Sequence, residues 1–176
     1  MEDPIGSRRI YEGRIINLRI DSVRMPDGRI REREIVEHRG AVAIVAVDAN
    51  NMVHLVRQFR SGPGRELLEI PAGTREKDEP LEECLQRELQ EEIGQRAGKL
   101  EPLVGFYTAP GFCTEYLDVY LATELVPSRL PGDDDEFISV DRVDISELDR
   151  LIQQGVICDA KSIVGVLMFL TRWRRG

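Results

Sequence analysis

Apolar and polar residues alternate along this chain in ways that predict both strands and helices. An unbroken apolar run, "AVAIVAV" at 41–47, indicates a buried strand, and "MVHLVRQF" at 52–59 follows it after the turn-forming "DANN". Shorter segments at 100–107 and 115–125 also have strand character, and apolar residues alternate within the second of them. These segments predict a sheet.

The N-terminal region has a different pattern. Residues 14–24 and 29–38 flank "MPDG", whose Pro-Asp-Gly sequence is typical of a tight turn, so we expect a β-hairpin. The two strands carry many Arg and Glu residues and too few large apolar ones to form a core of their own. We therefore expect the hairpin to pack against the main domain or against a second copy of the protein. We therefore divide the chain into an N-terminal β-hairpin region at 1–40, with a role in dimerisation, and a main domain at 41–176.

A helix is predicted at 80–93. Pro80 fits the first turn of a helix, and Asp78 or Glu79 is expected to cap it. Gly94 supplies the stop, because glycine readily adopts the conformation that ends a helix.

Three further segments complete the expected fold. "LLEIPAG" at 67–73 predicts a short strand that ends in a Pro/Gly loop, and helices are expected at 146–154 and 160–174. Strands and helices alternate irregularly, which favours an α+β fold with a mixed sheet over a doubly wound parallel sheet.

The helix at 80–93 crowds carboxylates beside its apolar edge. At about 100° per residue, Glu88, Glu91 and Glu92 fall in a sector about 100° wide. That sector overlaps the edge formed by apolar residues, which are Leu81, Leu85, Leu89 and Ile93. A charged surface helix, with Glu83 and Glu91 four residues from Arg87, is the alternative, but it leaves the convergence beside the core unexplained. A hard divalent cation such as Mg²⁺ takes oxygen ligands, so we interpret the helix as a metal site.

The net charge and the cysteines of the chain indicate which partners it can bind and in which compartment it is found. The net charge of -8 argues against broad binding to nucleic acid or to an anionic membrane, since both need a basic face. The chain has three cysteines, an odd number without CxxC spacing, at Cys84, Cys113 and Cys158. This pattern indicates free thiols in a reducing compartment. The start of the chain is unlike a signal peptide, and the apolar stretch at 163–170 is too short to span a membrane. We expect a cytoplasmic protein.

The residues around the helix match a longer signature. This stretch resembles the Nudix box, G-x5-E-x7-R-E-U-x-E-E-x-G-U, with fixed positions at Gly73, Glu79, Arg87, Glu88, Leu89, Glu91, Glu92 and Gly94. The last position, which is usually aliphatic, is Gln95 here. Many fixed positions at fixed spacing make this pattern far more specific than a short glycine motif.

The resemblance implies a Nudix-type α/β/α sandwich with a mixed sheet, and hydrolysis of a nucleoside diphosphate derivative that depends on Mg²⁺ or Mn²⁺. The metal ligands that it implies are Glu88, Glu91, Glu92 and the backbone carbonyl of Ala72. It also implies that Glu79 and Arg87 brace the loop and helix through charged hydrogen bonds, and that Gly73 and Gly94 are structural.

Other segments look like the ADP-ribose pyrophosphatase branch of that family. Pro110 and Gly111 in "APGF" lie where that branch carries Ser-Pro-Gly. "VRQFR" at 56–60 is similar to that branch's VRQYR stretch and would place Arg60 near the pyrophosphate, where a guanidinium binds oxygens in a forked pair.

The branch's N-terminal hairpin exchanges across a two-fold dimer, and "EGRI" and "EIVEH" resemble it. By that similarity Ile15 and Glu34 would line the nucleoside pocket of their own or of the partner subunit. Glu76 would lie near the substrate. Glu115 is a further candidate for contact with substrate or metal, and an ordinary glutamate at a strand edge is the alternative.

The resemblance thus implies a homodimer that converts ADP-ribose to AMP and ribose 5-phosphate. The base that takes the proton of the attacking water is either a box glutamate, Glu91 or Glu92, or an acid of the loop at 131–137, where Glu136 is preferred and Asp135 is next. The alternatives are the same chemistry on GDP-mannose, on another nucleotide sugar or on a dinucleotide. A different class is a non-catalytic module that binds ADP-ribose and regulates another protein.

Overall fold

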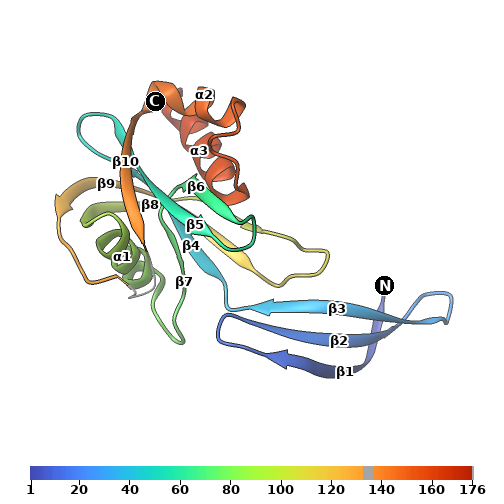
Figure 1. Ribbon diagram of the computed structural model, residues 1–176. Coiled ribbons are helices and arrows are strands. Elements are labelled where there is room, and N and C mark those ends of the chain that lie inside the picture. Colours follow the sequence, from blue (N-terminus) through green and yellow to red (C-terminus); the bar gives the residue numbers. More distant parts are fainter. Residues whose placement is uncertain (133–136, 176) are drawn as a thin grey trace. The chain divides into compact units, whose positions relative to one another are not determined.

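The computed structural model describes residues 1–132 and 137–175. They form two compact units (Figure 1). The first unit contains residues 1–40 and 106–116, and the second contains residues 41–105 and the described residues from Leu117 onward. The fold class is α+β, as predicted.

The first unit is built on an antiparallel sheet in the order β1-β2-β3. Its strands are β1 (Asp3–Glu12), β2 (Ile16–Arg24) and β3 (Ile30–His38). The predicted hairpin is confirmed, since β2 and β3 pair from Ile16↔His38 to Arg24↔Ile30. Its turn closes where the Gly28 N–H donates to the Met25 carbonyl at 2.9 Å, and Gly28 has φ +84°, which glycine adopts without steric cost. Strand β1 was not predicted, because all of its residues are exposed and burial therefore imposes no alternation on them.

Residues 106–116 complete the first unit beside β3. The Val36 N–H donates to the Phe112 carbonyl at 2.7 Å, and the Thr114 N–H donates to the Val36 carbonyl at 2.9 Å. These backbone bonds join a segment late in the sequence to the N-terminal hairpin.

The second unit is built on a mixed sheet in the order β10-β5-β4-β9-β8, with β6 paired to β5 and β7 paired to β4. Strand β4 runs parallel to β9, while its pairings with β5 and β7 are antiparallel. The strands are β4 (Ala41–Val47), β5 (Met52–Arg60), β6 (Arg65–Glu69), β7 (Ala72–Thr74), β8 (Gln95–Tyr107), β9 (Tyr116–Pro127) and β10 (Ile138–Asp144).

Two features of this sheet differ from the sequence prediction. The single strand expected at 67–73 is divided into β6 and β7, which pair with different neighbours because Ile70 and Pro71 carry the chain from β5 across to β4. Strand β10 was not predicted. Its residues include none in the buried class, so it lacks the apolar alternation that would have indicated a strand.

Helices cover both faces of the sheet (Figure 1). They are α1 (Leu81–Glu92), the short 3₁₀ helix η1 (Ile145–Glu147), α2 (Leu148–Gln153) and α3 (Ala160–Trp173). Every residue of β4 is buried. Val42, Ile44 and Ala46 pack in one cluster with the buried side chains of α1. On the other face, Gly165 of α3 lies so near the sheet that a Cβ there would come within 3.4 Å of Val45.

The end of α1 is as predicted, whereas its start is not. Gly94 has φ +65° and follows the last turn of the helix, so it is the predicted stop. Pro80 is the N-cap, and among the described residues no side chain caps this end, so capping by Asp78 or Glu79 was wrong. The Glu79 carboxylate instead forms an ion pair with Arg87.

The part of the chain that the structure describes contains no helix with the length and hydrophobicity that a membrane span requires.

The packing of α1 on β4 leads to a prediction about stability. Leu89 has no exposed surface, and Leu89→Ala removes its contacts with the core and leaves a cavity. We expect this substitution to lower the free energy of unfolding by about 2–5 kcal/mol in urea denaturation. Leu167→Ala is the matched control, because Leu167 of α3 is 43% exposed and should change the free energy by no more than about 0.5 kcal/mol. Equal losses of stability in both variants would contradict the packing of Leu89 against the core.

Candidate functional site

The guanidinium of Arg87 connects the loop before α1 with the carboxylates on the helix. Its Nε and Nη2 donate to the two oxygens of Glu79 at 2.8 and 3.1 Å. Its Nη1 donates to Glu88 Oε1 at 2.7 Å and to Glu91 Oε2 at 3.0 Å. Arg87 therefore neutralises part of the repulsion among three carboxylates and fixes the loop against the helix.

This arrangement shifts the titration of its members. Arg87 lowers the pKa of Glu79 from 4.5 to about 2, chiefly through the hydrogen bonds between the two side chains. The pKa of Arg87 is raised, and the largest cause is its hydrogen bonds to Glu79. Burial raises the pKa of Cys84 to about 12, with Glu79 as a further cause, so this thiol is protonated at neutral pH and is not a nucleophile.

Glycine at position 73 makes room for the Glu88 carboxylate. A Cβ built on Gly73 would lie 1.8 Å from Glu88 Oε1 and 2.0 Å from its carboxyl carbon. Those distances are far shorter than any van der Waals contact, so only glycine lets the carboxylate lie directly against the backbone of β7. Glu88 is 7% exposed, which agrees with the predicted position beside the core.

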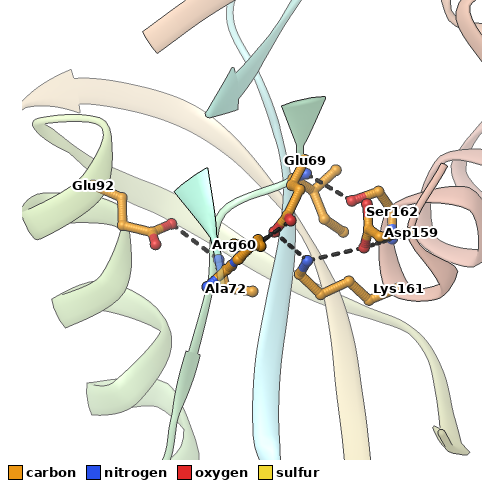
Figure 2. A network of polar contacts seen from close by, with 8 residues as sticks. Arg60, Glu69, Ala72, Glu92, Asp159, Lys161 and Ser162 are labelled. Carbon is orange, nitrogen blue, oxygen red and sulfur yellow. Dashed lines mark hydrogen bonds and ion pairs between the residues drawn. The ribbon is translucent and has the colours of Figure 1, made fainter. Parts of the chain in front are cut away.

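Glu92 is attached to the same short strand. The Ala72 N–H donates to Glu92 Oε2 at 3.0 Å (Figure 2). Glu92 is 4% exposed, so this carboxylate also borders the core instead of the solvated side of α1. The peptide groups of Ala72 and Gly73 thus lie against two of the three glutamates that were expected to bind metal.

The ligands predicted from the sequence have the chemistry that a hard divalent cation requires. They are carboxylates and a backbone carbonyl, which are the oxygen ligands that Mg²⁺ and Mn²⁺ prefer. The space at Gly73 that Glu88 occupies fits the same interpretation. Among the described residues no three Asp, Glu, His or Cys side chains form a group that could hold a metal ion. Glu88 and Glu91 are bonded to Arg87, and Glu92 is bonded to the Ala72 N–H.

A buried charged cluster lies on the α3 side of the same segment and was not predicted. Glu69 at the end of β6 is 1% exposed. Arg60 donates to both oxygens of Glu69 through Nε and Nη2, and Lys161 donates to Glu69 Oε2 at 2.5 Å (Figure 2). The signal for it was a glutamate inside the apolar strand "LLEI", since a buried carboxylate needs cationic partners.

The predicted site residues fall in both units. Arg60, Glu76 and the residues of the box belong to the second unit, whereas Ile15, Glu34 and Glu115 belong to the first. Glu76 is exposed, and its N–H donates to Glu79 Oε2 at 2.9 Å. Glu136 and Asp135, the expected bases of the late loop, lie outside the described residues.

Within the first unit, Ile15 and Glu115 have defined surroundings. Ile15 is 56% exposed and lines a cavity of about 330 Å³ together with Arg14, His38 and Arg39. Glu115 accepts a hydrogen bond from Thr108 Oγ1 at 2.7 Å, and its other oxygen lies 3.5 Å from His38 Nδ1.

The remaining residues predicted in the first unit lie on its surface. Glu34, Pro110 and Gly111 are exposed. Glu34 projects from β3, and the other two lie in the turn between β8 and β9.

Comparison with known proteins places this geometry in a class. The NUDIX domain model matches residues 37–163, and the nucleoside diphosphate sugar hydrolase N-terminal domain model matches residues 2–36. The chain therefore belongs to the Nudix hydrolase family, in the group that carries this N-terminal domain.

Individual relatives are similar over most of their length. The ADP-ribose pyrophosphatase of Bacillus subtilis (strain 168) is 39% identical over 94% of this chain and 90% of its own. The ADP-ribose pyrophosphatase of Mycobacterium tuberculosis (strain ATCC 25618 / H37Rv) is 42% identical over 94% of this chain and 81% of its own. A crystal structure of an ADP compounds hydrolase superposes with a TM-score of 0.88 at 22% identity, covering 99% of this chain and 95% of that one, so it shares the fold.

The pKa of Glu79 leads to a prediction about pH. Its folded pKa lies below its ordinary value, so the pair with Arg87 stabilises the fold above about pH 4.5 and loses that effect as the pH falls toward 2. We expect Glu79→Gln to lower the free energy of unfolding by about 2 kcal/mol at pH 7. The difference from the unsubstituted protein should shrink steadily below pH 4.5.

The control is Glu82→Gln. Glu82 is the second residue of α1, and its carboxylate is exposed. The effect of this substitution should be a few tenths of a kcal/mol, since only the helix dipole is involved. Chemical denaturation at a series of pH values measures both variants. A loss in Glu79→Gln that does not change with pH would contradict the assigned cause.

Proposed function

We propose that this chain hydrolyses the pyrophosphate bond of ADP-ribose to AMP and ribose 5-phosphate with Mg²⁺, or Mn²⁺, as cofactor. The observation that carries the proposal is the geometry of the loop and helix at 72–92. Arg87 donates hydrogen bonds to Glu79, Glu88 and Glu91, and Gly73 leaves room for the Glu88 carboxylate against the backbone. The relatives named as ADP-ribose pyrophosphatases support the choice of substrate.

The metal ligands in this proposal are Glu88, Glu91, Glu92 and the carbonyl of Ala72. A divalent cation held there would offset the charge of the phosphate oxygens and lower the pKa of a bound water. The chain's own contribution is orientation. Arg87 directs Glu88 and Glu91, and the Ala72 N–H directs Glu92. The proton of the attacking water is assigned to a carboxylate, and Glu91, Glu92 and Glu136 are the candidates.

Substrate contacts complete the proposal. Arg60, whose side chain is 36% exposed, is held by Glu69 in a forked pair that fixes the guanidinium plane, which suits it to donate to pyrophosphate oxygens. Glu76 is assigned to the same substrate. In the first unit the proposed contacts to substrate are Ile15, Glu34, Pro110, Gly111 and Glu115.

We also propose that the protein is a cytoplasmic homodimer joined through the N-terminal sheet. All residues of β1 are exposed, including Ile5, Ile10 and Tyr11. An edge strand with unpaired backbone groups and exposed apolar side chains is suited to pairing with a second chain. All three cysteines are free thiols, which supports a reducing compartment.

The activity is tested with the purified full chain, Mg²⁺ and a panel containing ADP-ribose, GDP-mannose and a dinucleoside polyphosphate. We expect preferential conversion of ADP-ribose, with AMP and ribose 5-phosphate identified as products. Glu92→Gln keeps the size of the side chain but removes the anionic ligand, so activity should fall by about 100-fold or more. Removal of metal with EDTA should abolish turnover, and added Mg²⁺ or Mn²⁺ should restore it.

The matched control is Glu83→Gln, which removes an exposed carboxylate from the same helix and should keep full activity. Preference for GDP-mannose would move the substrate assignment to another nucleotide sugar while keeping the metal chemistry. Tight binding of ADP-ribose without turnover of any compound would instead assign the chain to non-catalytic regulators.

The dimer is tested by measuring molar mass in solution. We expect sedimentation equilibrium to give twice the mass of one chain, and Ile10→Glu to shift the equilibrium toward the monomer, because a charge would be buried in the interface. Val126→Glu is the control, since Val126 of β9 is 53% exposed and belongs to the second unit. A monomeric unsubstituted protein would overturn this part of the proposal.

A further inference from the structure

Consecutive residues at 69–72 are together bonded to four elements of the second unit, which are β4, β5, α1 and α3. The Glu69 carboxylate binds Arg60 of β5 and Lys161 of α3. These contacts anchor the start of the segment to the sheet on one side and to the C-terminal helix on the other (Figure 2).

The backbone of the same segment makes the remaining bonds. The Ile70 N–H donates to Ser162 Oγ at 2.9 Å, which is a second bond to α3. The Pro71 carbonyl accepts from an N–H of β4 at 2.8 Å. The Ala72 N–H donates to Glu92 of α1 at 3.0 Å. The position of the Ala72 peptide is thus determined by both helices and by the sheet between them.

Burial of the Glu69 carboxylate removes it from water, which costs hydration free energy. A buried ion pair is often no more stabilising than apolar residues of the same volume, because the charges lose their hydration. Burial by itself raises the pKa of Glu69, but Arg60 and Lys161 outweigh it, so that the pKa is lowered and the group stays ionised. What the charge supplies is direction, since a carboxylate held by two cations can occupy one orientation.

Lys161 stands at a position where a cation is unfavourable. It is the second residue of α3, close to the positive end of the helix dipole. Asp159 offsets part of this effect by accepting from the Ser162 N–H at 3.1 Å and from Lys161 Nζ at 2.9 Å. A lysine that needs such compensation is explained by its bond to Glu69.

We propose that Glu69 and Lys161 are a positioning pair that anchors α3 to segment 69–72 and thereby sets the metal affinity of the site built on Ala72 and Glu92. The inference rests on the proposed function, because it assumes that Ala72 and Glu92 are ligands. Neither Glu69 nor Lys161 contacts the metal in this proposal. They act through the Ala72 peptide, which supplies one ligand and orients another.

The test is a double-substitution cycle with Mn²⁺ affinity as its readout. Free Mn²⁺ is measured by electron paramagnetic resonance on the full chain without substrate, for the unsubstituted protein, Glu69→Gln, Lys161→Met and the double variant. We expect each single substitution to weaken Mn²⁺ binding by about tenfold, as supporting residues of metal sites do. The double variant should be no weaker than the weaker single variant, because the two residues act through one bond.

The matched control is Arg172→Met, which removes another cation from α3, one that is paired with Glu101 at the surface. Its Mn²⁺ affinity should equal that of the unsubstituted protein. Melting temperatures are recorded for every variant, so that loss of stability is separated from loss of metal binding.

Two results would overturn the inference, and they differ from one another. Unchanged Mn²⁺ affinity in Lys161→Met and Glu69→Gln, with lowered melting temperatures, would reduce the pair to a structural role while the proposed function stands. Absence of Mn²⁺ binding by the unsubstituted protein would overturn the proposed metal site and this inference with it. If Lys161→Met does not fold, Glu69→Gln decides, because glutamine keeps the volume of glutamate and leaves Lys161 paired with Asp159.

Discussion

The repulsion among the glutamates of α1 is the constraint on which the candidate site depends. Like charges three or four residues apart on a helix are neighbours and destabilise it, and the effect grows where water is excluded. Arg87 resolves this for Glu88 and Glu91 and uses its other two nitrogens to hold Glu79 of the preceding loop. The same guanidinium therefore keeps the helix intact and fixes the loop in front of it. A cation bound by these glutamates would act on the same repulsion.

Residues 69–73 contact helices on both sides of the sheet. Toward α1, Gly73 and Ala72 lie against Glu88 and Glu92. Toward α3, Glu69 and Ile70 are bonded to Lys161 and Ser162. Because the apolar core fills the space between each helix and β4, these charged groups border the core in places where their partners are fixed by the fold. Such preorganisation would serve the proposed binding of a metal ion and a pyrophosphate group.

Much of the fold was predictable because its signals are local. Strand β4 was predicted from seven apolar residues and is buried throughout. The hairpin of β2 and β3 followed from its Pro-Asp-Gly turn, and α1 followed from its apolar edge and Gly94. Strands β1 and β10 were missed, since neither packs an alternating apolar face into the core. The predicted capping of α1 by Asp78 or Glu79 was wrong, because the N-cap is Pro80 and the Glu79 carboxylate accepts from Arg87, eight residues further on.

The sequence by itself determined the class of chemistry. The spacing of Gly73, Glu79, Arg87 and the three glutamates is a property of one helix and its loop, so it can be recognised without a structure. Only the tertiary structure decided what surrounds that helix. Glu69 and Lys161 are 92 residues apart in the chain, and no local pattern couples them. Their contact exists because β6 and α3 pack in the same unit, where a buried carboxylate is stable only when cations from distant segments reach it.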